Sequence, residues 1–187
     1  MTELEQLLEA FTPRGAQEIS DMQIFKRAAT DPSALTRDAL AHFTASAIVL
    51  NPQHDKILGI FHKIYQSWGW LGGHADGDGD LLAVARREVE EESGLTELKI
   101  LSDAPISIED LTVAGHVHRT RGYVSAHLHL NVTFLFEADD TALLRQNKAE
   151  TGGIAWIPID EFVEKSTEPE MKIIYQKIIS RIGEWHG

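Results

Sequence analysis

Three glutamates in residues 86–95 have the types and spacing of a divalent-metal site. Glu88 and Glu92 are four residues apart and Glu91 is three residues after Glu88, so a helix places the three carboxylates on one face and turns Glu90 away. Like charges at these spacings destabilise a helix, and a bound cation reverses that effect. Oxygen ligands without a thiolate favour Mg²⁺ or Mn²⁺ over zinc. The alternative is a solvated acidic helix face, which is the usual state of a charge run.

The glutamates need a helix and a loop to position them. The sequence predicts a helix over residues 80–93, with Gly94 at the place of a C-cap glycine. A loop rich in glycine and aspartate, residues 72–80, precedes it. Glycines there allow the backbone to approach a ligand closely.

The strands predicted around this helix include one with two distinct faces. Residues 44–50 and 56–62 read as two strands of a hairpin. In the longest candidate, residues 123–137, alternate side chains differ in polarity, so one face packs in the core and the other lines something polar. The polar set is Ser125, His127, His129, Asn131 and Thr133, and the apolar set is Ala126, Leu128, Leu130, Val132 and Phe134.

Helices are predicted at both ends of the chain. Thr2 and Glu5 have capping-box spacing, and Ile19, Met22 and Phe25 recur at helical spacing. The last helix, residues 169–185, is predicted to bury one apolar stripe. The members of that stripe are Ile173, Ile174, Ile178 and Ile182. Because strands and helices mix without strict alternation, the sequence predicts an α+β fold, a mixed α/β sandwich.

Composition excludes several classes of protein. The 187 residues suggest one domain, and 43 % apolar residues suffice for a core. A net charge of −12 disfavours nucleic acid or an anionic membrane as the main partner. The absence of cysteine excludes disulfides, thiolate metal sites and cysteine nucleophiles, and fits the cytoplasm, where we expect the protein. No stretch approaches the roughly 20 apolar residues of a membrane span, and the first ten residues do not resemble a signal peptide.

The helix and its loop resemble the signature of the Nudix hydrolase family, the Nudix box. Eight of its nine fixed positions match, and the ninth, a glutamate, is replaced by Gly79. The matching residues are Gly73, Arg87, Glu88, Val89, Glu91, Glu92, Gly94 and Leu95. The resemblance implies a Nudix-like α/β/α sandwich over residues 42–187, with residues 1–41 as a helical extension outside it.

The resemblance also implies an activity and roles for these residues. It predicts a Mg²⁺-dependent hydrolase of a nucleoside diphosphate linked to another group, with Mn²⁺ as a substitute. Glu88, Glu91 and Glu92 would bind the metal, and Arg87 would orient them through an ion pair. In the family the general base is either a box glutamate, here Glu91 or Glu92, or a glutamate in a later loop, a position that Glu150 fits.

Two departures from the family pattern bear on the loop. Gly79 replaces the glutamate that often braces the box arginine, and Asp78 or Asp80 is positioned to replace it as the partner of Arg87. Leu71 stands where a proline often precedes the double glycine. Neither departure removes a metal ligand.

The partner expected is a small nucleotide derivative, and the chain is a possible homodimer. The residues predicted to contact the substrate are Gly73, His74, Trp68, His127 and His129. For His127 and His129, which share a strand face, three roles stay open: a hydrogen-bonded polar face, contacts to substrate oxygens, or a second metal site.

The sequence disfavours two functions other than that of a hydrolase. An isopentenyl diphosphate isomerase of the same superfamily relies on a catalytic cysteine, which this chain lacks. A ligand sensor that keeps the fold without turnover usually loses box glutamates, and all three are retained here.

Overall fold

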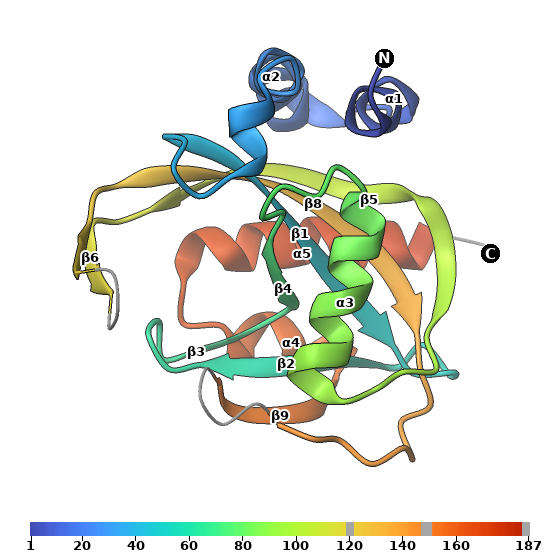
Figure 1. Ribbon diagram of the computed structural model, residues 1–187. Coiled ribbons are helices and arrows are strands. Elements are labelled where there is room, and N and C mark those ends of the chain that lie inside the picture. The colour runs from blue at the N-terminus through green and yellow to red at the C-terminus, as the bar shows by residue number, and fades with distance from the viewer. Residues whose placement is uncertain (119–121, 147–150, 185–187) are drawn as a thin grey trace.

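The fold is a mixed sheet between helices, described here from a computed structural model that covers residues 1–118, 122–146 and 151–184 (Figure 1). Five strands follow the order β3-β2-β1-β8-β5, while β4 pairs with β1 and β9 pairs with β2. The β1–β8 pair is parallel and the other pairs are antiparallel. The strands of this sheet are β1 (Ala41–Leu50), β2 (Lys56–His62), β3 (Ser67–Gly69), β4 (Leu71–His74), β5 (Lys99–Val113), β8 (His127–Glu137) and β9 (Thr151–Pro158).

Helices cover both faces of the sheet. In Figure 1, α3 crosses one face, and α4 and α5 lie behind the other. The helices are α1 (Glu3–Ala10), α2 (Gly15–Ala28), α3 (Leu81–Ser93), α4 (Ile159–Lys165) and α5 (Pro169–Glu184), with a short 3-10 turn at Pro32–Leu35. This is the predicted α+β, Nudix-like sandwich, and the fold prediction is confirmed.

Alternation along β1 divides the core into two clusters. Phe43, Ala45 and Val49 belong to the cluster shared with α3, whereas Ile48 and Leu50 pack with α4 and α5. Every residue from 43 to 50 is buried, as expected for a central strand covered on both sides.

The face of the sheet that packs with α4 and α5 also carries a polar patch. The hydroxyls of Thr44 and Ser46 donate to Asn131 Oδ1 at 3.1 and 2.8 Å, and Asn131 Nδ2 donates to Thr133 Oγ1 at 3.0 Å. Leu130, Val132 and Phe134 point into the opposite core cluster. The two-faced strand predicted for this segment is therefore confirmed in β8 for residues 130–134.

The first two helices join the main core. Thr2 and Glu5 form the predicted capping box of α1. Met22 and Phe25 of α2 are buried, and the Phe25 ring meets that of Phe43 edge-on. Of the three residues predicted at helical spacing, Ile19 is 57 % exposed, and the fully buried residue beside it is Glu18.

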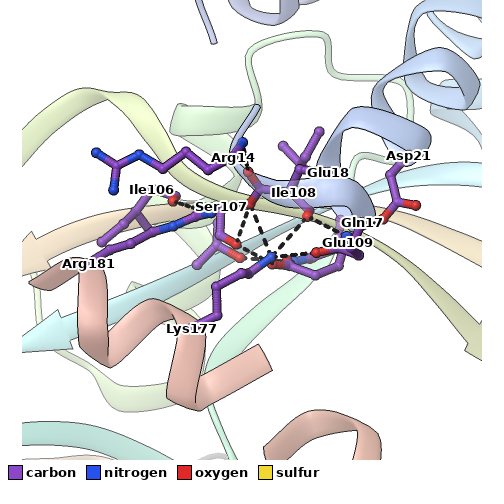
Figure 2. Close-up of polar contacts among 12 residues, drawn as sticks. Arg14, Gln17, Glu18, Asp21, Ile106, Ser107, Ile108, Glu109, Lys177 and Arg181 are labelled. Carbon is purple, nitrogen blue, oxygen red and sulfur yellow. Dashed lines mark hydrogen bonds and ion pairs between the residues drawn. The ribbon is translucent and has the colours of Figure 1, made fainter. Parts of the chain in front are cut away.

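A buried ion network fixes α2 to β5 and α5 (Figure 2). Glu18 accepts hydrogen bonds from Arg181 Nη1 at 2.6 Å and from Lys177 Nζ at 3.1 Å. Lys177 Nζ also lies 2.7 Å from the Glu109 carboxylate of β5, so this one cation contacts two buried carboxylates, those of Glu18 and Glu109. Burial opposes ionisation of Glu18, but the bonds from Arg181 and the Arg14 amide outweigh it and lower its pKa. Burial raises the pKa of Glu109 despite its contact with Lys177.

Two other sequence predictions need correction. The single strand expected at 123–137 is divided into β7 (Gly122–Val124), which pairs with β6 (His116–His118) in a separate hairpin, and β8. Ile173 is 69 % exposed, whereas Ile178 and Ile182 of the predicted stripe are buried, together with Met171 and Tyr175. No helix within the described ranges is long and apolar enough to span a membrane.

Candidate active site

Helix α3 has a defined start and end that set the positions of its glutamates. Asp80 caps the helix by accepting a hydrogen bond from the Ala83 amide at 3.0 Å. Gly94 ends it in the left-handed conformation at φ 75°, which glycine adopts at little cost. Three of the residues between, Val84, Ala85 and Val89, are buried against the sheet, so the rotation of the helix is fixed. The predicted helix is confirmed, with Asp80 as its cap.

Two of the three glutamates lie against the backbone of β4. Glu92 is only 7 % exposed, and its Oε2 accepts a hydrogen bond from the Gly72 amide at 3.1 Å. The Glu88 carboxylate lies directly over Gly73, where a Cβ atom would stand 2.6 Å from both carboxylate oxygens. A side chain at Gly73 would therefore force the Glu88 carboxylate, the end of a flexible side chain, to move away.

Glu90 and Glu91 of the same helix have different surroundings from Glu88 and Glu92. Glu91 is exposed. Glu90 points away, as predicted, and pairs with Arg86 at 3.0 Å. Glu90 is thus a glutamate of the same helix that does not share the face of the other three.

Asp78 is the partner of Arg87. Its Oδ2 lies 3.2 Å from Arg87 Nη1, and both side chains are partly exposed. Asp80, the other residue considered for this role, is engaged at the helix cap. At Gly79, where the Nudix pattern has glutamate, a Cβ would have no atom within 4 Å, so the position is open.

A cleft of about 620 Å³ opens beside Gly72 and Gly73. Its lining contains a polar set and a largely apolar, aromatic set of side chains. The polar set includes Thr44, Ser46, His74, His129 and Asn131, and the other set includes Tyr65, Trp70, Met171, Ile174 and Tyr175. The cleft therefore offers hydrogen-bonding groups and an aromatic surface to one ligand.

Histidines cluster at the wall of this cleft. The ring centroid of His129 lies 5.0 Å from that of His42 and 4.8 Å from that of His74. Burial, followed by the charge of Arg37, lowers the pKa of His74 to about 3. Burial, followed by the neighbouring histidines, lowers that of His129 to about 2. Both imidazoles are therefore neutral near pH 7.

The sequence matches the NUDIX domain family over residues 40–178. The chain belongs to the Nudix family. It is accordingly a hydrolase acting on phosphoanhydride bonds. No curated protein sequence matches this Nudix hydrolase.

Solved structures of other Nudix proteins share the fold. An Ap4A hydrolase from C. elegans, solved as a binary complex, aligns with a TM-score of 0.58 at 16 % identity over 76 % of this chain and 98 % of its own. RenU, a Nudix hydrolase from M. smegmatis, gives 0.56 at 14 % identity over 78 % and 88 %. The E. coli dihydroneopterin triphosphate pyrophosphohydrolase gives 0.55 at 12 % identity over 74 % and 94 %. At such identities the likeness concerns the fold alone.

Nudix hydrolases generally use divalent metals, and the donors of α3 fit such an ion. Glu88, Glu91 and Glu92 supply only carboxylate oxygens, the ligands that Mg²⁺ and Mn²⁺ prefer. Their side chains are not gathered into a cluster. Within the described ranges, the ligand atoms of three or more such side chains converge only at His42, His74 and His129.

Some of the other predicted site residues of this Nudix hydrolase line the cleft, some lie away from it, and one falls outside the described residues. Gly73, His74 and His129 line the cleft, and His127 lies behind His129, with 3.2 Å between their Nε2 atoms. Trp68 does not line the cleft, because its ring packs edge-on against Phe61 and lies over Gly153. Glu150 falls outside the described residues.

His42 is the member of the histidine cluster that the sequence analysis missed. The predicted strand began at Thr44, whereas β1 begins at Ala41. A signal was present, because His42, Thr44 and Ser46 alternate with apolar residues as His127, His129 and Asn131 do. The parallel pairing of β1 with β8 then places His42 directly beside His129.

Proposed function

We propose that this Nudix hydrolase cleaves the diphosphate linkage of a nucleoside diphosphate derivative with Mg²⁺, or Mn²⁺ as a substitute, held by Glu88, Glu91 and Glu92. The observation that carries the proposal is the contact between α3 and β4. Glu92 bonds to the Gly72 amide, Glu88 lies over Gly73, and both glycines line the cleft. Two of the three carboxylates thus contact backbone that forms part of the wall of the cavity that would hold a substrate.

Each residue of this region has a part in the proposed reaction. When bound, the metal ion neutralises charge on the phosphate oxygens and activates a water molecule. The three glutamates hold the ion, while the Asp78–Arg87 pair fixes the loop to the helix that carries them. Gly73 leaves room for the Glu88 carboxylate.

The size and lining of the cleft suit a nucleotide derivative. Its volume, about 620 Å³, is in the range of roughly 300–1,000 Å³ typical of small-molecule sites. The hydroxyls and amide of Thr44, Ser46 and Asn131 offer polar contacts, and Trp70 and Tyr65 offer aromatic surface to a base. We propose His74 and His129, which line the cleft, as substrate contacts; His127 and Trp68, also predicted from the sequence, do not line it.

We assign the general base to one of three glutamates, Glu91, Glu92 or Glu150. A base must reach the attacking water, so each candidate has a separate test. Replacement of the true base by glutamine removes one limb of the pH–rate profile. Replacement of a residue that only binds metal weakens the dependence on Mg²⁺ concentration instead.

The test is metal-dependent release of nucleotide or phosphate across a panel of substrates. The panel contains ADP-ribose, other nucleoside diphosphate sugars, dinucleoside polyphosphates and oxidised nucleotides, with EDTA as the blank. Turnover of one class that needs Mg²⁺ and stops with EDTA supports the proposal. Saturable binding of a panel member by folded protein without turnover would overturn it in favour of a ligand sensor.

A further inference from the structure

Three histidines lie together on adjacent strands of the sheet, and two of them, His42 and His129, are outside the Nudix box. His42 on β1 is the direct register partner of His129 on β8. On the other side of β1, His74 of β4 pairs with Thr44, which lies two residues from His42 and therefore on the same face. One ring nitrogen from each histidine lies within 4.8 Å of the other two. The sheet register thus brings three imidazoles together.

His42 carries a buried nitrogen without a hydrogen-bond partner in the described part of the chain. Its side chain is 2 % exposed, and Nδ1 is 2.9 Å from the Ala39 carbonyl oxygen. Nε2 has no hydrogen-bond partner among the residues that the structure describes. A buried polar atom left unpaired costs free energy, so such atoms usually have a protein, water or ion partner. A backbone carbonyl on one ring nitrogen is also the usual support for a histidine whose other nitrogen binds a metal.

The positive charge of Arg37 near the histidines is compensated, so it does not oppose the binding of a cation. Arg37 is the nearest positive charge that acts on His74, and Asp76 neutralises it through two hydrogen bonds of 2.6 Å. His127 is a fourth imidazole, with Nε2 3.2 Å from His129 Nε2 and Nδ1 2.9 Å from the Ser125 carbonyl oxygen. Two nitrogens on a tetrahedral zinc ion lie roughly 3.4 Å apart, given Zn–N distances of about 2.0–2.1 Å. His127 thus adjoins His129 closely, but it is not one of the three histidines whose ligand atoms all lie within 4.8 Å of one another.

We propose that His42, His74 and His129 bind a divalent transition-metal ion of the zinc class, separate from the Mg²⁺ that we assign to α3. Three neutral nitrogen donors without a carboxylate suit Zn²⁺, Co²⁺, Ni²⁺ or Cu²⁺ and disfavour Mg²⁺, which prefers oxygen. Because His74 and His129 line the cleft, the ion would border the substrate cavity. The inference concerns binding alone and does not depend on the proposed substrate.

The experiment measures binding of Zn²⁺ and Co²⁺ to full-length protein without an affinity tag, stripped of metal and then given excess Mg²⁺. We expect one Zn²⁺ per chain by calorimetry, and for Co²⁺ the visible absorption bands of a low-coordinate nitrogen site. His42→Gln and His129→Gln should each weaken Zn²⁺ binding at least about 100-fold, because even loss of a residue that only orients a ligand costs about 10–100-fold. Circular dichroism identifies the variants that remain folded.

Two matched controls make the assignment specific. His54→Gln alters a histidine outside the cluster, paired with Glu137 at 2.7 Å, and should leave Zn²⁺ affinity unchanged. Glu91→Gln should also leave it unchanged, because the box carboxylate is not a ligand of this site. The proposal is overturned if the native protein binds neither metal in the presence of Mg²⁺, if folded His42→Gln and His129→Gln proteins bind Zn²⁺ as tightly as the native protein, or if Glu91→Gln abolishes binding.

Discussion

Arg87 Nη1 lies 3.2 Å from Asp78 Oδ2, so the box arginine has a carboxylate partner although Gly79 replaces the usual glutamate. The substitute comes from the preceding residue of the same loop. Because both side chains are about 40 % exposed, the pair contributes little to stability, about 0–1 kcal/mol. Its value is in holding the loop against the helix that carries the metal-binding glutamates.

Asp78→Asn should therefore lower kcat about tenfold without a measurable change in the free energy of unfolding, since losing an orienting partner costs about 10–100-fold. Gly79→Glu alone should change the rate only modestly, because Arg87 is already paired. The double variant Asp78→Asn/Gly79→Glu should recover most of the activity, because the open position at Gly79 accepts a new carboxylate. Equal rates for native protein and Asp78→Asn would show that the ion pair has no part in orienting the glutamates.

Gly73→Ala should lower the rate by about 100-fold, because its Cβ would displace the Glu88 carboxylate and a shift of about 1 Å in a catalytic group has that effect. We expect little change in stability, because the atoms that the Cβ would meet are the end of a flexible side chain that can move. Gly79→Ala is the matched control in the same loop, with open space around its Cβ, and should retain activity. Steady-state kinetics and urea unfolding of both variants test this, and full activity in Gly73→Ala would refute the close approach.

Glu91→Gln should reduce kcat at least about 100-fold, because metal-assisted charge stabilisation is worth several kcal/mol and each 1.36 kcal/mol is tenfold. Glu91 is exposed, so the fold should be unaffected. Glu90→Gln, which removes only the Arg86 pair on the other side of α3, should keep nearly full activity. Kinetics at several Mg²⁺ concentrations provide the readout. If both variants lose activity equally, the general charge of the helix is responsible rather than a metal site.

Glu18→Gln should destabilise the protein by about 3 kcal/mol at pH 7, because it leaves Arg181 and Lys177 without one buried counter-charge and breaking a buried pair costs about 3–5 kcal/mol. The folded-state pKa of Glu18 lies below its ordinary value of 4.5. Its carboxylate therefore contributes stability above pH 4.5, and that contribution is lost as the pH falls through the lowered pKa. The difference between native and variant protein should accordingly shrink in acid.

Chemical unfolding at pH 7 and at a series of lower pH values measures that difference. Glu184→Gln is the matched control, because Glu184 pairs with Arg14 in an exposed ion pair and should contribute about 0–1 kcal/mol at any pH. A Glu18→Gln protein as stable as the native one at pH 7 would mean that the network in Figure 2 does not hold α2 in place.

Local patterns in the sequence were sufficient for most elements. The Asp80 cap and Gly94 delimit α3, and residues 56–62 form β2 as predicted, because capping, turn residues and apolar periodicity act within a few positions. The box spacing was also enough to identify the family. The division of the chain at residues 41 and 42 stays a prediction, and Leu4 and Phe25 from the first segment share one core cluster with Phe43.

Burial of individual side chains was less predictable. Ile19 and Ile173 are exposed, whereas Glu18 is fully buried. Hydrophobicity favours the burial of the isoleucines. Glu18 is buried instead because two cations from α5 contact its carboxylate and compensate the cost of removing it from water. No local rule could supply those cations, because Lys177 and Arg181 are about 160 residues away in the chain.

By itself, the sequence determined which chemistry the helix of residues 81–93 can offer, because residue types and helical spacing place the carboxylates of Glu88, Glu91 and Glu92 on one face. Only the tertiary structure decided what lies next to them. Pairing of β1 with both β4 and β8 brought Gly73 beneath Glu88, and joined His42, His74 and His129 from three separate stretches of chain. Strand partners and register depend on contacts between residues far apart in sequence, and the pattern of a single strand does not contain them.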